Sequence, residues 1–202
     1  MIQIRQEKRA DIPAREALLN AAMGEARFTK CSERLREDRV AAEGLSFVAI
    51  EDGRLVGTVR LWHVTAGPGR SALLLGPLAV APEAQGRGIG GALMTHALKA
   101  ARRSGADAVI LVGDAPYYGR FGFSAEKTGA LWMPGPYEQS RLLAVELKAG
   151  ALDGAHGLVS ASGKPEPKPS LAKLIASLKP ARRSQRVHAR LRRAMARLPQ
   201  AA

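Results

Sequence analysis

Gln85-Gly86-Arg87-Gly88-Ile89-Gly90-Gly91 is the stretch of sequence that decides the fold. It follows an apolar run that ends at Val80 and precedes residues 89–103, whose apolar positions recur at helical spacing. Glycines at a helix start leave backbone N–H groups uncovered, and the helix dipole adds partial positive charge at the same place. The stretch therefore predicts a phosphate-binding turn. It is not a P-loop, because no Lys-Ser/Thr pair follows its last glycine.

The segments on either side of this turn predict a mixed α/β fold. Period-two patterns and buried apolar runs predict strands at 2–5, 45–51, 54–64, 72–80, 108–112 and 141–147. Helical spacing predicts a helix that begins after Asp11, a charged helix at 32–42 and the helix at 89–103. Asp52-Gly53 indicates a hairpin turn, and Gly76-Pro77 interrupts its strand. The strand, helix and strand around the turn imply one parallel pair in an otherwise antiparallel sheet.

Charge is distributed unevenly along the 202 residues, whose net charge is +13. Residues 164–202 contain 11 Lys or Arg and one acidic residue, so the rest of the chain is nearly balanced. We expect a globular domain at 1–160, a Pro/Lys linker at 161–170 and a basic amphipathic tail, helical or disordered, at 171–202. We expect this tail to bind nucleic acid or an anionic membrane weakly at most, and in a salt-sensitive way.

Several classes of protein are excluded by composition. No apolar run approaches the roughly 20 residues that cross a bilayer, and the start shows no signal sequence, so we expect a cytoplasmic protein. The single cysteine, Cys31, excludes a disulfide within one chain and a cysteine-based metal cluster. We expect no metal.

Two motifs resemble those of the GNAT family of acetyltransferases, and most of all its uncharacterised bacterial YhbS-like members. The pattern Gln-x-x-Gly-x-Gly begins at Gln85, after the run Leu75-Gly-Pro-Leu-Ala-Val80. The segment Tyr118-Gly-Arg-Phe-Gly-Phe123 is similar to the family's Tyr-x-x-x-Gly-Phe. The resemblance covers about residues 1–150. It implies a twisted sheet with a splayed parallel strand pair, and transfer of an acetyl group from acetyl-CoA to a primary amine.

The resemblance also implies roles for individual residues. The pantetheine arm would lie along Leu78, Ala79 and Val80. The pyrophosphate would be held by Gln85, Gly86, Arg87, Gly88, Ile89, Gly90 and Gly91, with Arg87 adding a full charge. Tyr118 would contact the cofactor and act as the general acid on the leaving thiolate, with Tyr117 in reserve, and the main-chain amide near Val80 would stabilise the oxyanion. A phenol with a pKa near 10 matches a thiolate with a pKa of about 8.5 closely enough for this transfer.

The base, the acceptor and the biological role stay open at this point. Candidate bases are His63, Glu83, Asp114 or a water molecule. Candidate walls of the acceptor pocket are Arg34, Arg36, Trp62, Trp132 and Tyr137. Two alternatives to an enzyme are an acetyl-CoA sensor without turnover and a nucleic-acid or ribosome partner that acts through the tail. A homodimer is a further expectation that the sequence leaves open.

Overall fold

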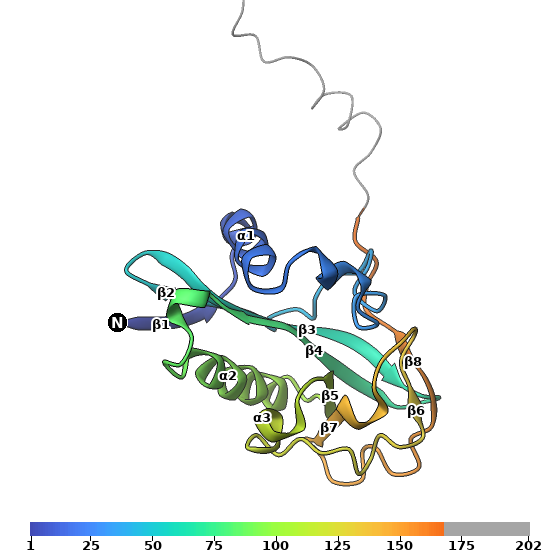
Figure 1. Ribbon diagram of the computed structural model, residues 1–202. Helices are drawn as coiled ribbons and strands as arrows, with labels where there is room; N and C mark the ends of the chain where they lie inside the picture. Colours follow the sequence, from blue (N-terminus) through green and yellow to red (C-terminus); the bar gives the residue numbers. More distant parts are fainter. Residues whose placement is uncertain (168–202) are drawn as a thin grey trace, which may run out of the picture. The chain divides into compact units, whose positions relative to one another are not determined.

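An antiparallel meander forms the first half of the sheet in the computed structural model, which describes residues 1–167 (Figure 1). Its strands are β1 (Ile2–Gln6), β2 (Ser46–Glu51), β3 (Arg54–Ala66) and β4 (Ser71–Val80). The β2–β3 hairpin turns at Asp52 and Gly53, whose φ angles of 48° and 77° are those that a tight hairpin turn requires. The predicted meander is confirmed.

The second half of the sheet contains the predicted parallel pair. Its elements are α2 (Ile89–Arg103), β5 (Ala108–Val112), α3 (Ala115–Gly119) and β7 (Leu142–Glu146). Strand β5 runs parallel to β4 and antiparallel to β7, so the central order is β1-β2-β3-β4-β5-β7. The mixed, mostly antiparallel fold class is thereby confirmed.

Alternating side chains of the central strands build two hydrophobic cores. On β4, Leu73 and Leu75 belong to one core, whereas Ala72 and Leu74 belong to the other. Successive residues of a strand point to opposite faces, so strands covered on both sides become apolar throughout. This is why 72–80 and 108–112 are nearly continuous apolar runs.

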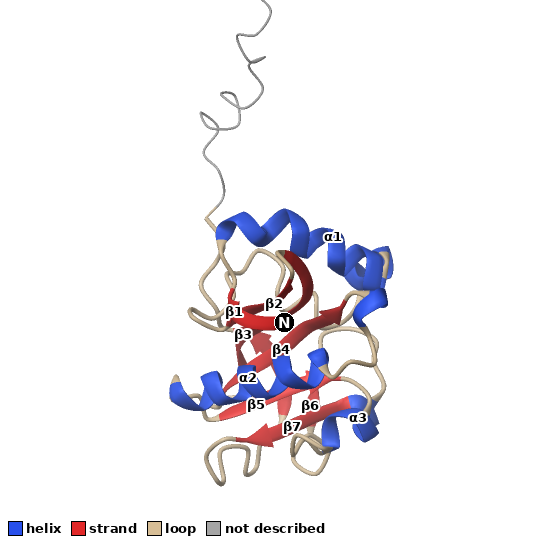
Figure 2. Cartoon of the chain, turned by 90° about the vertical axis from the view of Figure 1, so that its left-hand side faces the viewer, coloured by secondary structure: helices blue, strands red, loops and turns tan. Residues whose placement is uncertain are grey.

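Two helices cover opposite faces of the sheet. Helix α1 (Ile12–Met23) lies over one face and α2 lies over the other (Figures 1 and 2). Four short 3-10 helices join the larger elements: η1 (Arg9–Asp11), η2 (Glu25–Thr29), η3 (Pro82–Ala84) and η4 (Gln139–Arg141). The segment from η2 to β2 lies on the side of α1 (Figure 1).

The charged helix expected at 32–42 does not form. Residues 32–38 make successive hydrogen-bonded turns instead, with the N–H groups of Arg36 and Glu37 both donating to the carbonyl of Glu33. The segment buries Leu35 together with the charged Arg36. A regular helix gains most of its stability from an apolar face that packs, and this segment has little of one.

Residues 154–163, in which the sequence predicted no strand, contribute one. Strand β8 (Gly157–Ala161) pairs antiparallel with β3 and parallel with the short β6 (Leu131–Trp132). The chain then contacts residues 38–40, where the N–H of Val40 donates to the carbonyl of Lys164. A truncated protein that tests the basic tail should therefore keep residues 1–167 and lack residues 168–202.

The compact unit extends from Met1 to Glu166. The predictions made for 171–202, and for residues 168–170 of the linker, lie outside the described residues. Within the part that is described, no helix is long and apolar enough to cross a membrane. No group of three or more His, Cys, Asp or Glu side chains there could hold a metal ion.

Candidate active site

Strands β4 and β5 separate soon after they pair, and a cavity of about 750 Å³ lies where they part. Only two residue pairs, Leu73 with Val109 and Leu74 with Ile110, are in register between them. Residues 75–80 of β4 continue on that side without a partner among the strands of residues 1–167. The cavity extends from this gap to the glycine-rich turn.

Backbone N–H groups of β4 face the gap. The N–H of Ala81 donates to the carbonyl of Val56 at 2.9 Å, toward β3. Because successive N–H groups of a strand point to opposite edges, those of Val80 and Leu78 point away from β3 and toward the cavity. Both residues line it. An extended ligand could pair with this edge as an added strand would.

A bulge at Gly76-Pro77 bends β4 where the gap opens. The β3–β4 register shifts between Val59 and Leu61, as predicted for this glycine-proline pair. The indole N–H of Trp62 donates to the carbonyl of Gly76 at 2.6 Å and satisfies a group that the broken ladder would leave unpaired.

The glycine-rich turn presents the uncovered end of α2 to the cavity. Gly88 is the N-cap with a left-handed φ of 79°, and no side chain caps the helix. The first N–H groups of the helix, from Ile89 to Gly91, therefore lack intrahelical acceptors. An anion placed there meets both these donors and the helix dipole.

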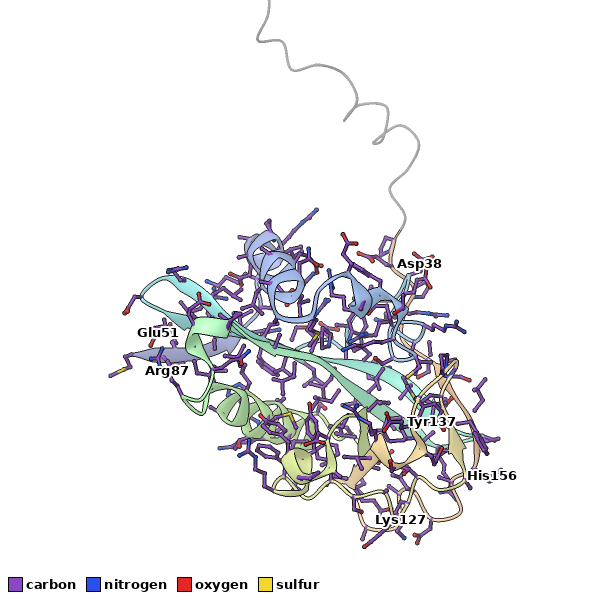
Figure 3. All side chains as sticks on the ribbon, in the orientation of Figure 1. Asp38, Glu51, Arg87, Lys127, Tyr137 and His156 are labelled. Carbon is purple, nitrogen blue, oxygen red and sulfur yellow. The ribbon has the colours of Figure 1, made fainter. Side chains whose placement is uncertain are left out.

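Arg87 is turned away from the cavity. Its guanidinium donates to both carboxylate oxygens of Glu51 at 2.9 and 2.5 Å, and Figure 3 shows the two side chains side by side at the sheet edge. Arg87 is also absent from the residues that line the cavity. Its role in phosphate binding stays a prediction, and it requires this ion pair to open.

Replacing Glu51 with glutamine tests that requirement. If Arg87 serves the phosphates, Glu51→Gln removes its competing partner and should raise the affinity for coenzyme A about two- to fivefold, the scale of an exposed ion pair. Isothermal titration calorimetry measures the change. Asp52→Asn is the matched control, because Asp52 is the adjacent carboxylate and makes no hydrogen bond to Arg87. Unchanged affinity in Glu51→Gln would mean that Arg87 does not reach the phosphates.

The two tyrosines of α3 lie at different ends of the cavity. A Cβ on Gly90 would lie 2.9 Å from the Tyr117 hydroxyl, so Tyr117 reaches the glycine-rich turn. A Cβ on Gly113 would lie 2.2 Å from Cε2 of Tyr118, so only glycine fits beneath that ring. Tyr118 therefore lies at the end of β5, close to the gap, whereas Tyr117 lies near the turn.

Burial changes the acidity expected for Tyr118. It raises the pKa of the Tyr118 phenol to about 12, because the phenolate would lose hydration, and neighbouring Tyr117 adds to the effect. Nearby Arg141 acts in the opposite direction. The phenol thus stays protonated throughout the neutral range, but it is a weaker acid than the sequence-based estimate of about 10.

Every cofactor residue predicted from the sequence except Arg87 lines this one cavity. These are Leu78, Ala79, Val80, Gln85, Gly86, Gly88, Ile89, Gly90, Gly91 and Tyr118. The sequence-based reasoning missed three cations that also line it, Lys30, Arg120 and Arg141. Arg120 stacks over the rings of Tyr117 and Phe121, and its place inside the tyrosine motif was the signal that could have found it.

The candidate bases separate in space. Asp114 lines the cavity, whereas His63 and Glu83 are exposed and do not. A second cavity of about 530 Å³ contains three of the predicted acceptor walls, Arg34, Arg36 and Trp62. The other two lie elsewhere: Trp132 is exposed on β6, and Tyr137 donates to the carbonyl of Leu131.

Fold and site together are those of an acetyltransferase of the α/β class: a mixed sheet that opens between two parallel strands beside a glycine-rich helix start. The chain belongs to the acetyltransferase (GNAT) family, whose model matches residues 13–123.

Two curated relatives and two solved structures illustrate the similarity. The uncharacterised N-acetyltransferase YhbS of Escherichia coli K12 is 32% identical over 158 residues, 77% of this chain and 93% of its own. YjhQ of the same organism is 39% identical over 106 residues, and the match spans 51% of this chain and 58% of YjhQ. The crystal structure of E. coli YhbS with CoA has a TM-score of 0.68 at 31% identity, covering 79% of this chain and 89% of that one. A GNAT acetyltransferase from Brucella melitensis with acetyl-CoA has a TM-score of 0.55 at 26% identity, covering 84% and 94%.

Proposed function

We propose that this protein transfers the acetyl group of acetyl-CoA to a primary amine. The observation that carries the proposal is the cavity in which the free N–H edge of β4, the uncapped start of α2 and Tyr118 meet. Its volume of about 750 Å³ is typical of a site for a ligand of this size. The CoA in the YhbS structure and the acetyl-CoA in the Brucella structure support the same donor here.

The residues fit coenzyme A by chemistry as well as by shape. The pantetheine amides would pair with the main chain of Leu78, Ala79 and Val80. Backbone N–H groups from Gln85 to Gly91 would receive the pyrophosphate. Lys30, Arg120 and Arg141 place positive charge around the cavity, where the described lining includes one carboxylate, that of Asp114. This charge balance favours an anionic ligand.

The reaction requires the bond from the acetyl carbon to sulfur to break as the bond to the amine nitrogen forms. The main-chain N–H of Val80 would stabilise the negative charge that develops on the thioester oxygen. Tyr118 would donate its phenolic proton to the leaving thiolate. The amine loses its proton to water, or to Asp114 through water, because no other candidate base lines the cavity. A cytoplasmic location remains part of the proposal.

Thiol release tests the proposed function directly. Incubation with acetyl-CoA and a panel of amines, amino acids, polyamines and peptides should release free CoA thiol faster than acetyl-CoA alone, and mass spectrometry should find the acetylated amine. Calorimetric binding of acetyl-CoA without turnover on any amine would favour the sensor. Failure to bind acetyl-CoA at all would contradict both.

A further inference from the structure

The cavity of about 750 Å³ that the proposed function assigns to acetyl-CoA, here called the donor cavity, shares two residues with the second cavity. These are Arg36 and Pro77. Pro77 belongs to the bulge at which β4 leaves β5, three residues before Val80, whose N–H the proposed function assigns to the thioester oxygen. The second cavity lies under η2 and the 32–38 turns, on the side of α1. An acceptor that approaches the thioester through the second cavity must pass Arg36.

Arg36 is a buried cation with unused hydrogen-bonding capacity. Its side chain is only 6% exposed. Nη2 donates to Glu33 at 2.7 Å and to the Ser32 hydroxyl at 3.4 Å. Nε is buried without an acceptor, and within residues 1–167 Nη1 makes no hydrogen bond. Nη1 lies 3.6 Å from the position of a Cβ on Gly76, so it points at the bulge.

The surroundings leave this positive charge poorly compensated. Arg15, Arg27 and Arg60 share the carboxylates of Glu7 and Glu16, and Arg36 has Glu33. Four guanidinium groups thus face three carboxylates. Burying an ion and leaving one of its donors, Nε, unsatisfied is costly, so one further anion at this place would be favoured.

Other carboxylates line the second cavity, but they are exposed to solvent. Glu37, Asp38 and Glu166 lie at its rim. Water and salt screen such charges, so they compensate the buried guanidinium weakly. Arg34 and Arg39 line the same cavity and are not buried, so these outer charges largely balance one another.

The mouth of the second cavity is also apolar. Ile12, Phe28 and Val40 are three of the large hydrophobic residues that the protein exposes, and all three line this cavity. Buried Leu19 and Trp62 continue the apolar wall inward. Exposed apolar side chains that gather at a cavity mark a binding site for an apolar group.

We propose that the acceptor is an α-amino acid with an apolar side chain, and that Arg36 binds its carboxylate. This inference rests on the proposed function and names the substrate class. The carboxylate and the amine are attached to one carbon, so a carboxylate on Nη1 beside Gly76 holds the amine at the point where β4 opens. The apolar side chain then occupies the second cavity. The reaction itself is unchanged: an amide bond forms, the thioester bond breaks, and Tyr118 protonates the thiolate.

A matched pair of amines tests the carboxylate. L-Leucine and 3-methylbutylamine differ only by that group. The wild-type protein should acetylate leucine with a kcat/KM about 10- to 100-fold higher, the scale of a charge-assisted hydrogen bond. Arg36→Gln should remove this preference through the KM for leucine, and Arg36→Lys should retain part of it. Arg102→Gln, an exposed arginine on α2 outside both cavities, should behave as wild type.

Two results would overturn the inference while leaving the proposed function intact. One is acetylation of both amines at similar kcat/KM by the wild type. The other is an equal loss for both amines in Arg36→Gln, which is the result expected if Arg36 only supports the 32–38 turns. Thermal melts show whether each variant folds. If Arg36→Gln does not fold, the preference for leucine over 3-methylbutylamine is compared between the wild type and Arg36→Lys. A wild-type preference that Arg36→Lys retains only in part supports the inference, and no wild-type preference overturns it.

Failure of the proposed function gives a different pattern. If no amine is acetylated, calorimetry with the CoA-saturated protein still tests Arg36. Leucine binding that Arg36→Gln loses and Arg102→Gln retains would support the carboxylate site without turnover. Absence of leucine binding to the CoA-saturated wild type would overturn it.

Discussion

Replacing Tyr118 with phenylalanine is expected to lower kcat about 100-fold while changing the affinity for acetyl-CoA little. General acid catalysis contributes about 10²- to 10⁴-fold, and it is most effective when the pKa values of donor and acceptor match. With a pKa of about 12, Tyr118 is a weaker acid than a thiol of about 8.5 requires for a close match. We therefore expect a loss of kcat near the lower end of this range, about 100-fold.

Two further tyrosines make this experiment specific. Tyr117→Phe should raise the KM for acetyl-CoA more than it lowers kcat, because the Tyr117 hydroxyl reaches the glycine-rich turn. Tyr137→Phe should leave both constants unchanged, since Tyr137 lines neither cavity and its hydroxyl donates to the carbonyl of Leu131. A large loss of kcat in Tyr117→Phe, with Tyr118→Phe unaffected, would reverse the two assignments.

The pH profile provides a second readout of the same residue. A phenol with a pKa of about 12 stays protonated below that pH, so it remains able to donate. The rate should rise with pH as the amine loses its proton and should show no descending limb up to about pH 11. A descending limb near pH 10, present in the wild type and absent from Tyr118→Phe, would mean that burial does not shift this pKa.

Replacing Gly88 with alanine is expected to weaken coenzyme A binding about 10- to 100-fold. Gly88 has a φ of 79°, and an alanine there must either accept this left-handed conformation or rotate the peptide that follows. Rotation would misdirect the first N–H groups of α2, to which the proposed function assigns the pyrophosphate. Calorimetric titration with coenzyme A measures the loss.

Gly105→Ala is the matched control for this variant. Gly105 has a φ of 80°, has no atom within 4 Å of its Cβ position, and follows the other end of α2. Gly88 shares the first two properties. Both variants should lose about 1–2 kcal/mol of stability in denaturant melts, and only Gly88→Ala should lose affinity. Equal affinities in the two variants would show that the turn does not bind the phosphates.

Local patterns in the sequence were sufficient to predict the helix and strands that surround the glycine-rich turn. Residues 89–103 and 108–112 form the predicted helix and strand with the predicted bounds, because helical spacing and apolar runs report burial within one segment. The bulge at Gly76-Pro77 and the hairpin at Asp52-Gly53 followed from backbone chemistry that few other residues share.

Contacts between segments far apart in the chain decided several features that local patterns did not predict. Strand β8 forms because the edge of β3 and the short β6 offer it partners, and Arg87 is held by Glu51, 36 positions away. The charged segment 32–38 gives up a helix and buries Arg36 against the bulge of β4. Periodicity describes one segment at a time, whereas the burial of a charge depends on which distant groups surround it. The sequence alone therefore predicted the glycine-rich turn, and the tertiary structure alone placed a buried cation with an unsatisfied donor between the two cavities.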